Sequence, residues 1–354
     1  MSKVFVLNDK TSFTGLGRYA EFLSNSVSGR LISIKNDKQK KTENFPGMVV
    51  EPMKRWPVGS GYQLSRRFPN VYYNKVSKML VKNMKDEDIL HYSSPGIVPI
   101  FDCNNRVVTI HDVFPTGNNG KIAETLSAKI FMKFASFENV ICVSNYTKNK
   151  LTDLDFNGKI KVIYPPIAES FQKLNVGKVE LRKKLNLPVD RKLVLSVSTD
   201  IPRKNLTMVS KVMEELGSDY RLVRIGSKIE DSLTFSNIDD ETLNEIYNAC
   251  DVLLFPSTDE GFGSPLAESL KIGLPAVCSD IEPFIEYAKN IAYISPLDPK
   301  VMAENVKEAV CRDEGRLNEG IKIAKKFSNE TFSKEMTRYY EDVFGVRLPQ
   351  QETS

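Results

Sequence analysis

Residues 252–268 read VLLFPSTDEGFGSPLAE, and this segment is the strongest indication of the fold class. Its leading apolar residues predict a short buried strand, and a loop with two glycines follows. Ser264 then suits the cap of a helix, and Pro265 suits its first position. A strand, a glycine loop and a helix in this order are typical of a parallel sheet, where the free amides of the helix attract phosphate. The stretch therefore predicts an α/β fold with an anion site at the end of this strand.

The same alternation of short apolar runs and amphipathic stretches continues through the rest of the chain. In the first half we expect the strands Val4–Leu7, Leu31–Ile34, Ile89–Tyr92, Val107–Ile110, Val140–Val143 and Lys161–Ile163. In the second half we expect Leu193–Val197, Arg221–Ile225, Val252–Phe255, Ala276–Cys278 and Ile291–Ile294. This rhythm favours two parallel, doubly wound sheets of the Rossmann type, each covered by helices on both faces.

The domain border is expected where this rhythm breaks, at Tyr164-Pro165-Pro166, because proline interrupts helices and strand pairing. A chain of 354 residues also exceeds the usual size of one hydrophobic core. We predict an N-terminal domain at 1–168, a C-terminal domain at 169–325, and a final helix within 326–354 that packs back across the linker.

Composition excludes several classes of protein. The hydrophobic fraction of 41% and charged fraction of 27% are ordinary for a globular chain, and no run approaches the roughly 18 apolar residues of a membrane span. The N-terminus predicts a strand rather than a signal peptide, so we expect a cytoplasmic protein. The five cysteines include no C-x-x-C pair, and the net charge is +4, so we expect neither a metal site nor nucleic-acid binding.

Two acids, Glu260 and Glu268, flank the glycine loop. A carboxylate beside a bare phosphate is unfavourable, but a carboxylate can accept hydrogen bonds from hydroxyl groups such as those of a ribose. The pair therefore indicates a nucleotide sugar as ligand.

The two glutamates, separated by seven residues with Gly261-Phe262-Gly263 between them, resemble the E-x7-E signature of the family-4 retaining glycosyltransferases (glycosyl transferases group 1). The resemblance implies the GT-B fold, with the active site in the cleft between two Rossmann-like domains. It implies that Glu260 faces the donor sugar, that Glu268 holds the ribose, and that the backbone from Gly261 through Phe262 and Gly263 to Ser264 binds the donor.

A second cluster, residues 197–205, reads VSTDIPRKN and follows the first strand expected in the second domain. Arg203 and Lys204 can stabilise the charge that develops on a departing nucleoside diphosphate. The segment resembles the G-x-x-x-P-R-K-N stretch of the same family. Ser198 stands where that family usually has glycine, and Thr199 stands where many members carry an arginine that contacts phosphate.

The first domain contains G-x-G-x-x-A from Gly15 to Ala20, a pattern also found in dinucleotide-binding enzymes. That alternative fits poorly, since seven residues separate Leu7 from Gly15 and no acid ends the second strand. In the resembled family this loop closes over the donor diphosphate, which implies that Gly15 and Gly17 bind the donor.

The sequence has two histidines, and both follow strand-like runs. His111 matches the His-Asp segment of the family, which implies contact with the donor sugar. His91 matches a loop that often lines the acceptor side. Ser144 has an ordinary explanation as a helix cap.

The resemblance implies retention of anomeric configuration, with catalysis by positioning and charge stabilisation. We expect no metal and no cofactor other than the donor, because Asp86-Glu87-Asp88 precedes its strand and Asp153-Leu154-Asp155 ends a helical stretch. The donor would be a nucleotide sugar of the mannose, glucose or rhamnose type, and the acceptor a glycan or a lipid-linked molecule. Two alternatives remain, a nucleotide-sugar epimerase and a non-catalytic nucleotide-sugar binder.

Residues 53–85 carry a concentration of basic and aromatic side chains without any Asp or Glu. The cations are Lys54, Arg55, Arg66, Arg67, Lys75, Lys78, Lys82 and Lys85, interleaved with Trp56, Tyr62, Phe68, Tyr72 and Tyr73. Such a mixture suits the interface of an anionic membrane. We predict peripheral membrane contact through this segment.

Overall fold

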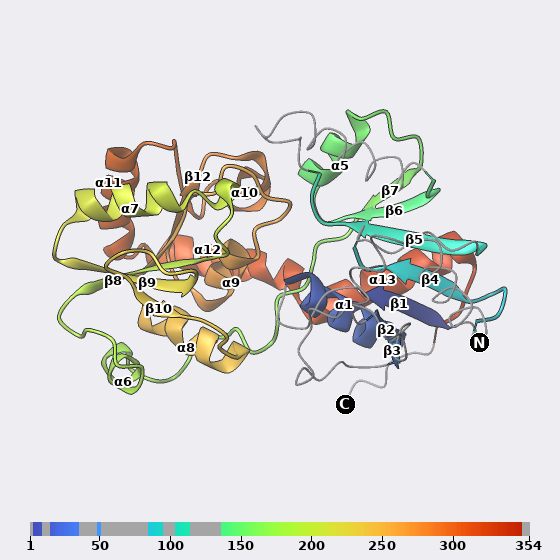
Figure 1. Ribbon diagram of the computed structural model, residues 1–354, viewed down its shortest axis with the longest axis horizontal. Helices are drawn as coiled ribbons and strands as arrows, with labels where there is room; N and C mark the ends of the chain where they lie inside the picture. The colour runs from blue at the N-terminus through green and yellow to red at the C-terminus, as the bar shows by residue number, and fades with distance from the viewer. Residues whose placement is uncertain are drawn as a thin grey trace, which may run out of the picture. The chain divides into compact units, whose positions relative to one another are not determined.

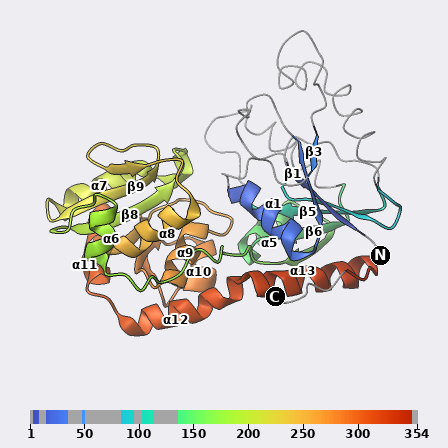
Figure 2. The ribbon, with the colours of Figure 1, turned by 90° about the horizontal axis from the view of Figure 1, so that it is seen from below.

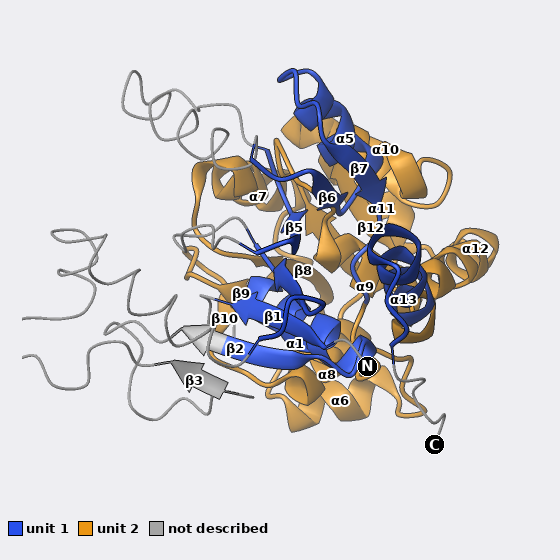
Figure 3. Cartoon of the chain, turned by 90° about the vertical axis from the view of Figure 1, so that its right-hand side faces the viewer, with its two compact units in different colours: residues 1–166, 332–354 blue, residues 167–331 orange. Residues whose placement is uncertain are grey.

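The computed structural model describes residues 3–8, 15–34, 48–50, 84–94, 103–113 and 136–348. The chain divides into two compact units (Figure 3). Unit 1 consists of residues 1–166 and 332–354, and unit 2 consists of residues 167–331. The sequence placed these borders after residue 168 and after residue 325.

In the described part of unit 1, seven strands form one sheet, and each neighbouring pair is parallel (Figure 1). From one edge to the other the strands are β3 (Met48–Val50), β2 (Arg30–Ile34), β1 (Val4–Asn8), β4 (Ile89–Tyr92), β5 (Asn105–Ile110), β6 (Asn139–Cys142) and β7 (Lys159–Val162). The strand order reverses between β1 and β4. Such a reversal is the usual place for a ligand in an open parallel sheet.

The two faces of this sheet have separate cores, because side chains alternate along each strand. Val4, Val6 and Ile89 pack with helices α1 (Gly15–Ser26) and α13 (Asn329–Phe344) on one face (Figure 2). Phe5 and Leu7 face the other way, toward Leu151 of α5 (Asn145–Thr152). Helix α13 contributes four buried residues to the core of unit 1, Phe332, Met336, Tyr339 and Tyr340. Residues 332–344 of α13 are therefore part of the core of unit 1.

Unit 2 contains a second parallel sheet, of six strands. Their order is β10 (Leu233–Phe235), β9 (Tyr220–Gly226), β8 (Lys192–Ser198), β11 (Val252–Phe255), β12 (Ala276–Ser279) and β13 (Tyr293–Ser295). Helices α7 (Leu206–Leu216) and α11 (Pro299–Val310) cover one face, and α8 (Asp240–Ala249) and α9 (Ser264–Ile272) cover the other (Figure 1). The remaining helices are α6 (Lys178–Lys184), α10 (Glu282–Ala288) and α12 (Glu314–Ala324), with 3-10 turns η1 (Pro202–Lys204) and η2 (Lys325–Phe327).

Every strand expected from the sequence is present within a few residues of its predicted bounds. The short strands β3 and β10 were not predicted. In unit 2 the order reverses between β8 and β11, since β9 lies on one side of β8 and β11 on the other. The loops that follow β8 and β11 therefore meet at the carboxyl edge of the sheet, and both carry residues singled out by the sequence.

Candidate functional site

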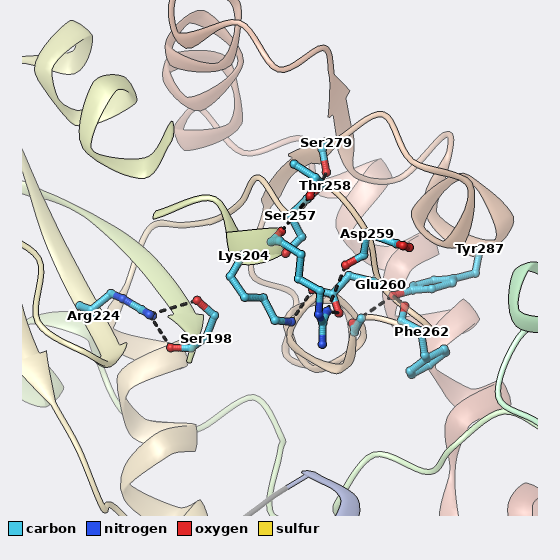
Figure 4. Close-up of polar contacts among 12 residues, drawn as sticks. Ser198, Lys204, Arg224, Ser257, Thr258, Asp259, Glu260, Phe262, Ser279 and Tyr287 are labelled. Carbon is cyan, nitrogen blue, oxygen red and sulfur yellow. Dashed lines mark hydrogen bonds and ion pairs between the residues drawn. The ribbon is translucent and has the colours of Figure 1, made fainter. Parts of the chain in front are cut away.

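The loops after β8 and β11 are joined directly to each other (Figure 4). The backbone N–H of Thr258 donates to the carbonyl oxygen of Arg203 at 2.8 Å. The loop after β11 is also tied to the neighbouring strand, because the Ser279 hydroxyl donates to the carbonyl oxygen of Ser257. These bonds fix the backbone that carries the charged residues of the site.

Glu260 is the centre of a three-residue ion cluster. Its Oε2 accepts from Nη1 of Arg203 at 2.8 Å, and its Oε1 accepts from Nζ of Lys204. The Glu260 side chain is only 6% exposed, against 12% for Lys204 and 25% for Arg203. Lys204 also lies with Nζ 5.2 Å from the ring centroid of Phe255, the last residue of β11. The structure thus brings together three residues that the sequence placed in one site.

The net charge of this cluster is one positive unit, since two cations share one carboxylate. Each oxygen of an ionised carboxylate has capacity for a second hydrogen bond. Glu260 can therefore hold Arg203 and Lys204 in place and also accept from a hydroxyl group of a ligand. An anion at this edge would meet two cations whose positions are already fixed, which avoids the cost of ordering long side chains on binding.

The glycine loop has a backbone that only glycine suits at one position. Gly263 has φ of +89°, and a Cβ built there would lie 2.5 Å from Cε1 of Phe284. The Tyr287 hydroxyl donates to the carbonyl oxygens of Phe262 at 3.1 Å and Gly263 at 3.2 Å. The phenol of Tyr287 thereby fixes the orientation of the two peptide groups that lead into α9.

The side chain of Phe262 serves the core rather than a ligand. It is 5% exposed, stacks on Tyr287 with ring centroids 5.3 Å apart, and meets the edge of Phe327 at 5.0 Å. The donor contact expected at Phe262 can therefore involve its backbone alone.

Two details of the predicted start of α9 are wrong. Gly263, not Ser264, is the capping residue, and no side chain caps the helix. Ser264 is exposed and is the first helical residue, so Pro265 stands one position later than expected. The amides of Leu266 and Ala267 bond to the Gly263 carbonyl, and proline has no N–H. Among the first four residues of α9, only Ser264 therefore has an N–H that makes no hydrogen bond within the helix.

Glu268 lies beyond the first turn of α9, which contains no acid. Its Oε2 accepts from the hydroxyl of Tyr247 at 2.6 Å. Tyr247 is fully buried on α8 and its ring meets the edge of Phe171 at 5.7 Å. The phenol thus orients the carboxylate that the sequence assigned to a ribose.

In unit 1, His111 follows β5 and is half-buried. Its Nε2 lies 2.8 Å from the carbonyl oxygen of Ser93, so this nitrogen carries the proton, and the ring meets the edge of Tyr19 at 4.6 Å. Burial lowers the pKa of His111 to about 4. The imidazole is therefore neutral near pH 7, with Nδ1 as its acceptor nitrogen. Gly15 is exposed at the start of α1, and Gly17 is buried in the same helix.

The structure corrects the role expected for His91. This residue is fully buried, with Nδ1 2.5 Å from the Tyr340 hydroxyl and Nε2 2.7 Å from the Thr109 hydroxyl. Thr109 also contacts the Tyr19 hydroxyl at 3.0 Å. Both ring nitrogens are used inside the core, so His91 does not offer a group to an acceptor. It links α13 to the sheet of unit 1.

One acid in each of the two segments weighed as metal sites has a structural role. Asp88 accepts from the amides of Lys3 and Lys85, each at 2.8 Å, and Asp153 ends α5. Ser144 caps α5, accepting from the Thr147 amide at 3.0 Å, as the sequence predicted. Within the described ranges, no group of three or more His, Cys, Asp or Glu side chains gathers at a spacing that suits a metal ion. In the same part of the chain, no helix combines the length and apolarity needed to span a membrane.

The fold matches solved structures across almost the whole chain. Sucrose-phosphate synthase from Thermosynechococcus elongatus superimposes with a TM-score of 0.77 and 16% identity, covering 98% of this chain and 100% of that one. HepE from Anabaena, solved in complex with UDP and glucose, gives a TM-score of 0.76 and 14% identity, covering 97% of this chain and 100% of that one. At these identities the likeness establishes the fold, and the predicted GT-B class is confirmed.

The family follows from the sequence comparison. Residues 177–327, nearly all of unit 2, match the family described as glycosyl transferases group 1. This segment belongs to that family, as its motifs predicted. The chain is 24% identical over 225 residues to the O-antigen chain mannosyltransferase RfbU of Salmonella typhimurium, covering 57% of this chain and 60% of that protein. It is 35% identical over 135 residues to the serotype-specific mannosyltransferase WbdA of Escherichia coli, covering 32% and 17% respectively.

Proposed function

We propose that this chain is a retaining, metal-independent glycosyltransferase that moves a hexose from a nucleotide diphosphate sugar to a glycan or lipid-linked acceptor. The observation that carries the proposal is the ion cluster of Arg203, Lys204 and Glu260 at the strand-order reversal of unit 2. An open parallel sheet binds nucleotides at that edge. The family of residues 177–327 and the mannosyltransferase names of two relatives support a hexosyl transfer.

The proposed chemistry rests on charge at the leaving group. Breaking the bond between sugar and diphosphate leaves an extra negative charge on the phosphate oxygens. Arg203 and Lys204 would stabilise that charge, and the Ser264 N–H would add a hydrogen bond at the start of α9. Because the cations are prepositioned by Glu260, little reorganisation is needed as the charge develops.

The remaining assignments concern the sugar and the nucleoside. Glu260 would accept from a hydroxyl group of the donor sugar while it holds the two cations. Glu268, oriented by Tyr247, would accept from the ribose hydroxyls. His111 is neutral near pH 7, so it would act toward the donor sugar as a hydrogen-bonding group without charge. In this proposal Gly15 and Gly17 bind the donor diphosphate.

Calorimetric titration with a panel of nucleoside diphosphates tests the binding part of the proposal. One nucleoside diphosphate should bind with micromolar affinity in buffer that contains EDTA, and its affinity should exceed that of the free nucleoside. Equal affinity for nucleoside and diphosphate would mean that the ion cluster does not contact phosphate. No binding of any member would contradict the proposed donor class.

We further propose that residues 53–85 bring the enzyme to an anionic membrane. This prediction falls almost entirely outside the described residues and rests on the charge of the segment. Flotation with liposomes should show binding that rises with anionic lipid and falls with added salt, since salt screens surface charge. The variant with Arg66, Arg67, Lys75 and Lys78 changed to Glu should not float. Equal flotation of this variant would exclude the segment as the contact.

A further inference from the structure

Arg224 is a fully buried arginine beside the candidate site, and the sequence did not single it out. It lies near the carboxyl end of β9, which pairs with β8 in the register Ser196↔Arg224 and Ser198↔Gly226. β8 is the strand that leads into Arg203 and Lys204. Arg224 therefore contacts the last residues of the strand on which the two cations depend.

The guanidinium of Arg224 holds the end of β8 with several hydrogen bonds (Figure 4). Nη1 donates to the carbonyl oxygens of Ser196 at 2.9 Å and Ile225 at 2.5 Å. Nη2 donates to the carbonyl oxygen of Ser198 and, at 3.0 Å, to its hydroxyl. All these acceptors are neutral, and Nε is buried without a hydrogen-bond partner.

A buried arginine is normally paired with a carboxylate. Among the residues that the structure describes, no carboxylate forms an ion pair with Arg224. Burial lowers the pKa of Arg224 to about 10, while the field of Asp200 opposes this change. The residue is therefore still a cation near neutral pH. An unpaired buried charge is costly, and a bound anion at the same edge of the sheet would offset that cost.

Arg182 offers a direct contrast within unit 2. It is also buried, but its Nη2 donates to Oδ2 of Asp251 at 2.6 Å. Asp251 precedes β11, so this ion pair lies at the amino ends of the strands. Arg224 lies near their carboxyl ends, where the candidate anion site is. Arg182 thus has a carboxylate partner and lies at the amino ends of the strands. Arg224 has only neutral acceptors among the described residues and lies near the carboxyl ends.

The junction between the two strands leaves little room for adjustment. Gly226 has φ of +119°, and a Cβ at this position would lie 2.1 Å from the carbonyl oxygen of Ser198. A tight turn follows Ser198, with the Lys204 amide bonded to the Ile201 carbonyl at 2.9 Å. A short, hydrogen-bonded segment connects Ser198 to Arg203 and Lys204. A shift of Ser198 would therefore also move these two residues.

We propose that Arg224 is a positioning residue of the anion site in unit 2. It fixes the end of β8 through Ser198, holds the turn that presents Arg203 and Lys204, and adds a positive charge that forms no ion pair with a carboxylate in the described ranges. The inference rests on the proposed function, since it assigns the anion to the diphosphate of the donor.

The test compares two arginine variants with the native protein, using inorganic pyrophosphate as a probe that is independent of the base. Arg224→Met keeps most of the side-chain volume and removes the charge and the donors. We expect it to weaken pyrophosphate binding in calorimetry by about tenfold or more, as the loss of a charged hydrogen-bonding group does. Arg182→Met, the matched control, should lower the thermal midpoint but leave pyrophosphate affinity within about twofold, because its ion pair is at the other edge.

The outcomes separate the inference from the proposed function. If the native protein does not bind pyrophosphate, the proposed anion site itself is wrong. If the native protein binds it and Arg224→Met binds it equally well, the role of Arg224 is wrong. An equal loss of affinity in Arg182→Met would also overturn the inference, since the loss would then reflect general stability.

A second pair of variants covers the case in which Arg224→Met does not fold. Arg224→Lys keeps the charge, but a single ammonium group cannot reach both Ser196 and Ser198 as the guanidinium fork does. We expect this variant to bind pyrophosphate several-fold more weakly than the native protein, and Arg182→Lys to bind it normally. Native affinity in Arg224→Lys would show that the contacts to β8 do not position the site, which would overturn the inference.

Discussion

Arg203 and Glu260 follow different strands, and Nη1 of the arginine donates to Oε2 of the glutamate at 2.8 Å. The same arginine nitrogen donates to the carbonyl oxygen of Asp259 at 3.0 Å. The contact joins the loops after β8 and β11, where the strand order of unit 2 reverses. Charge and backbone geometry at this edge are thus set by one pair of residues and their neighbour Lys204.

Replacing Lys204 with Ala should lower turnover about 100- to 1,000-fold, the range for loss of one prepositioned charge-stabilising group. The matched control is Lys178→Ala, which removes a lysine paired with Asp251 at 3.0 Å on the opposite edge of the sheet. The control should keep native turnover. Steady-state kinetics at saturating donor would check both, and near-native turnover in Lys204→Ala would remove Lys204 from the mechanism.

Replacing Glu260 with Gln should have opposite effects on anion binding and on turnover. The change raises the net charge of the cluster from one positive unit to two, so pyrophosphate should bind more tightly by several-fold. Turnover should fall by about tenfold or more, because the hydrogen bond to the donor sugar weakens and the cations lose their fixed positions. Calorimetry with pyrophosphate and steady-state kinetics would measure the two effects. Weaker pyrophosphate binding would contradict this prediction, because it would show that the loss of ordered cations outweighs the gain in net charge.

Replacing Glu268 with Ala should weaken binding of the nucleoside diphosphate by roughly 1 to 3 kcal/mol, because charge-assisted hydrogen bonds to the ribose are lost. Pyrophosphate affinity should not change. Tyr247→Phe should give a smaller loss in the same direction, since it removes only the hydrogen bond that orients Glu268. Calorimetry with both ligands separates ribose contact from phosphate contact, and a parallel loss of pyrophosphate affinity would argue against the ribose assignment.

The two histidines predict that unit 1 loses stability in acid. Burial lowers the pKa of His91 to about 3 and that of His111 to about 4, from an ordinary value of 6.5. At any pH between the folded pKa of a histidine and 6.5, that histidine binds more protons in the unfolded chain than in the folded chain. The contribution of each histidine is therefore complete above pH 6.5 and is lost as the pH falls through its folded pKa.

The thermal midpoint of the native protein should accordingly fall as the pH is lowered from 7 to 4.5, and the fall should be shallower in the His91→Gln, His111→Gln double variant. Glutamine keeps hydrogen-bonding capacity and does not titrate. Calorimetric scans across this pH range measure both slopes. Identical slopes would show that other groups cause the acid sensitivity.

The sequence predicted the fold well because its strands are short apolar runs bounded by clear breaks. Strands β3 and β10 were missed, since each has three residues and too little pattern to detect. The sequence also predicted that Arg203, Lys204 and Glu260 lie close together, because each follows a strand and parallel strands have their carboxyl ends on the same side of the sheet.

Local side-chain contacts were harder to predict. His91 has the same sequence signal as His111, a histidine after an apolar run, but its partner Tyr340 is far away in the chain and on α13. Arg224 and Tyr247 gave no signal as site residues, because one lies within an ordinary strand and the other within an ordinary helix. Serine is a common helix cap, which favours Ser264 from the sequence, but the capping residue is Gly263, whose φ is positive.

Mass spectrometry of the native protein, incubated with a panel of nucleotide diphosphate sugars in the presence of EDTA, tests the proposed transferase activity itself. We predict that one donor is consumed, that its nucleoside diphosphate is released, and that the sugar appears on water or on an added acceptor. The Lys204→Ala variant should consume that donor at least about 100-fold more slowly. If no donor is consumed, or if consumption requires added manganese, the account of a metal-independent transferase is contradicted.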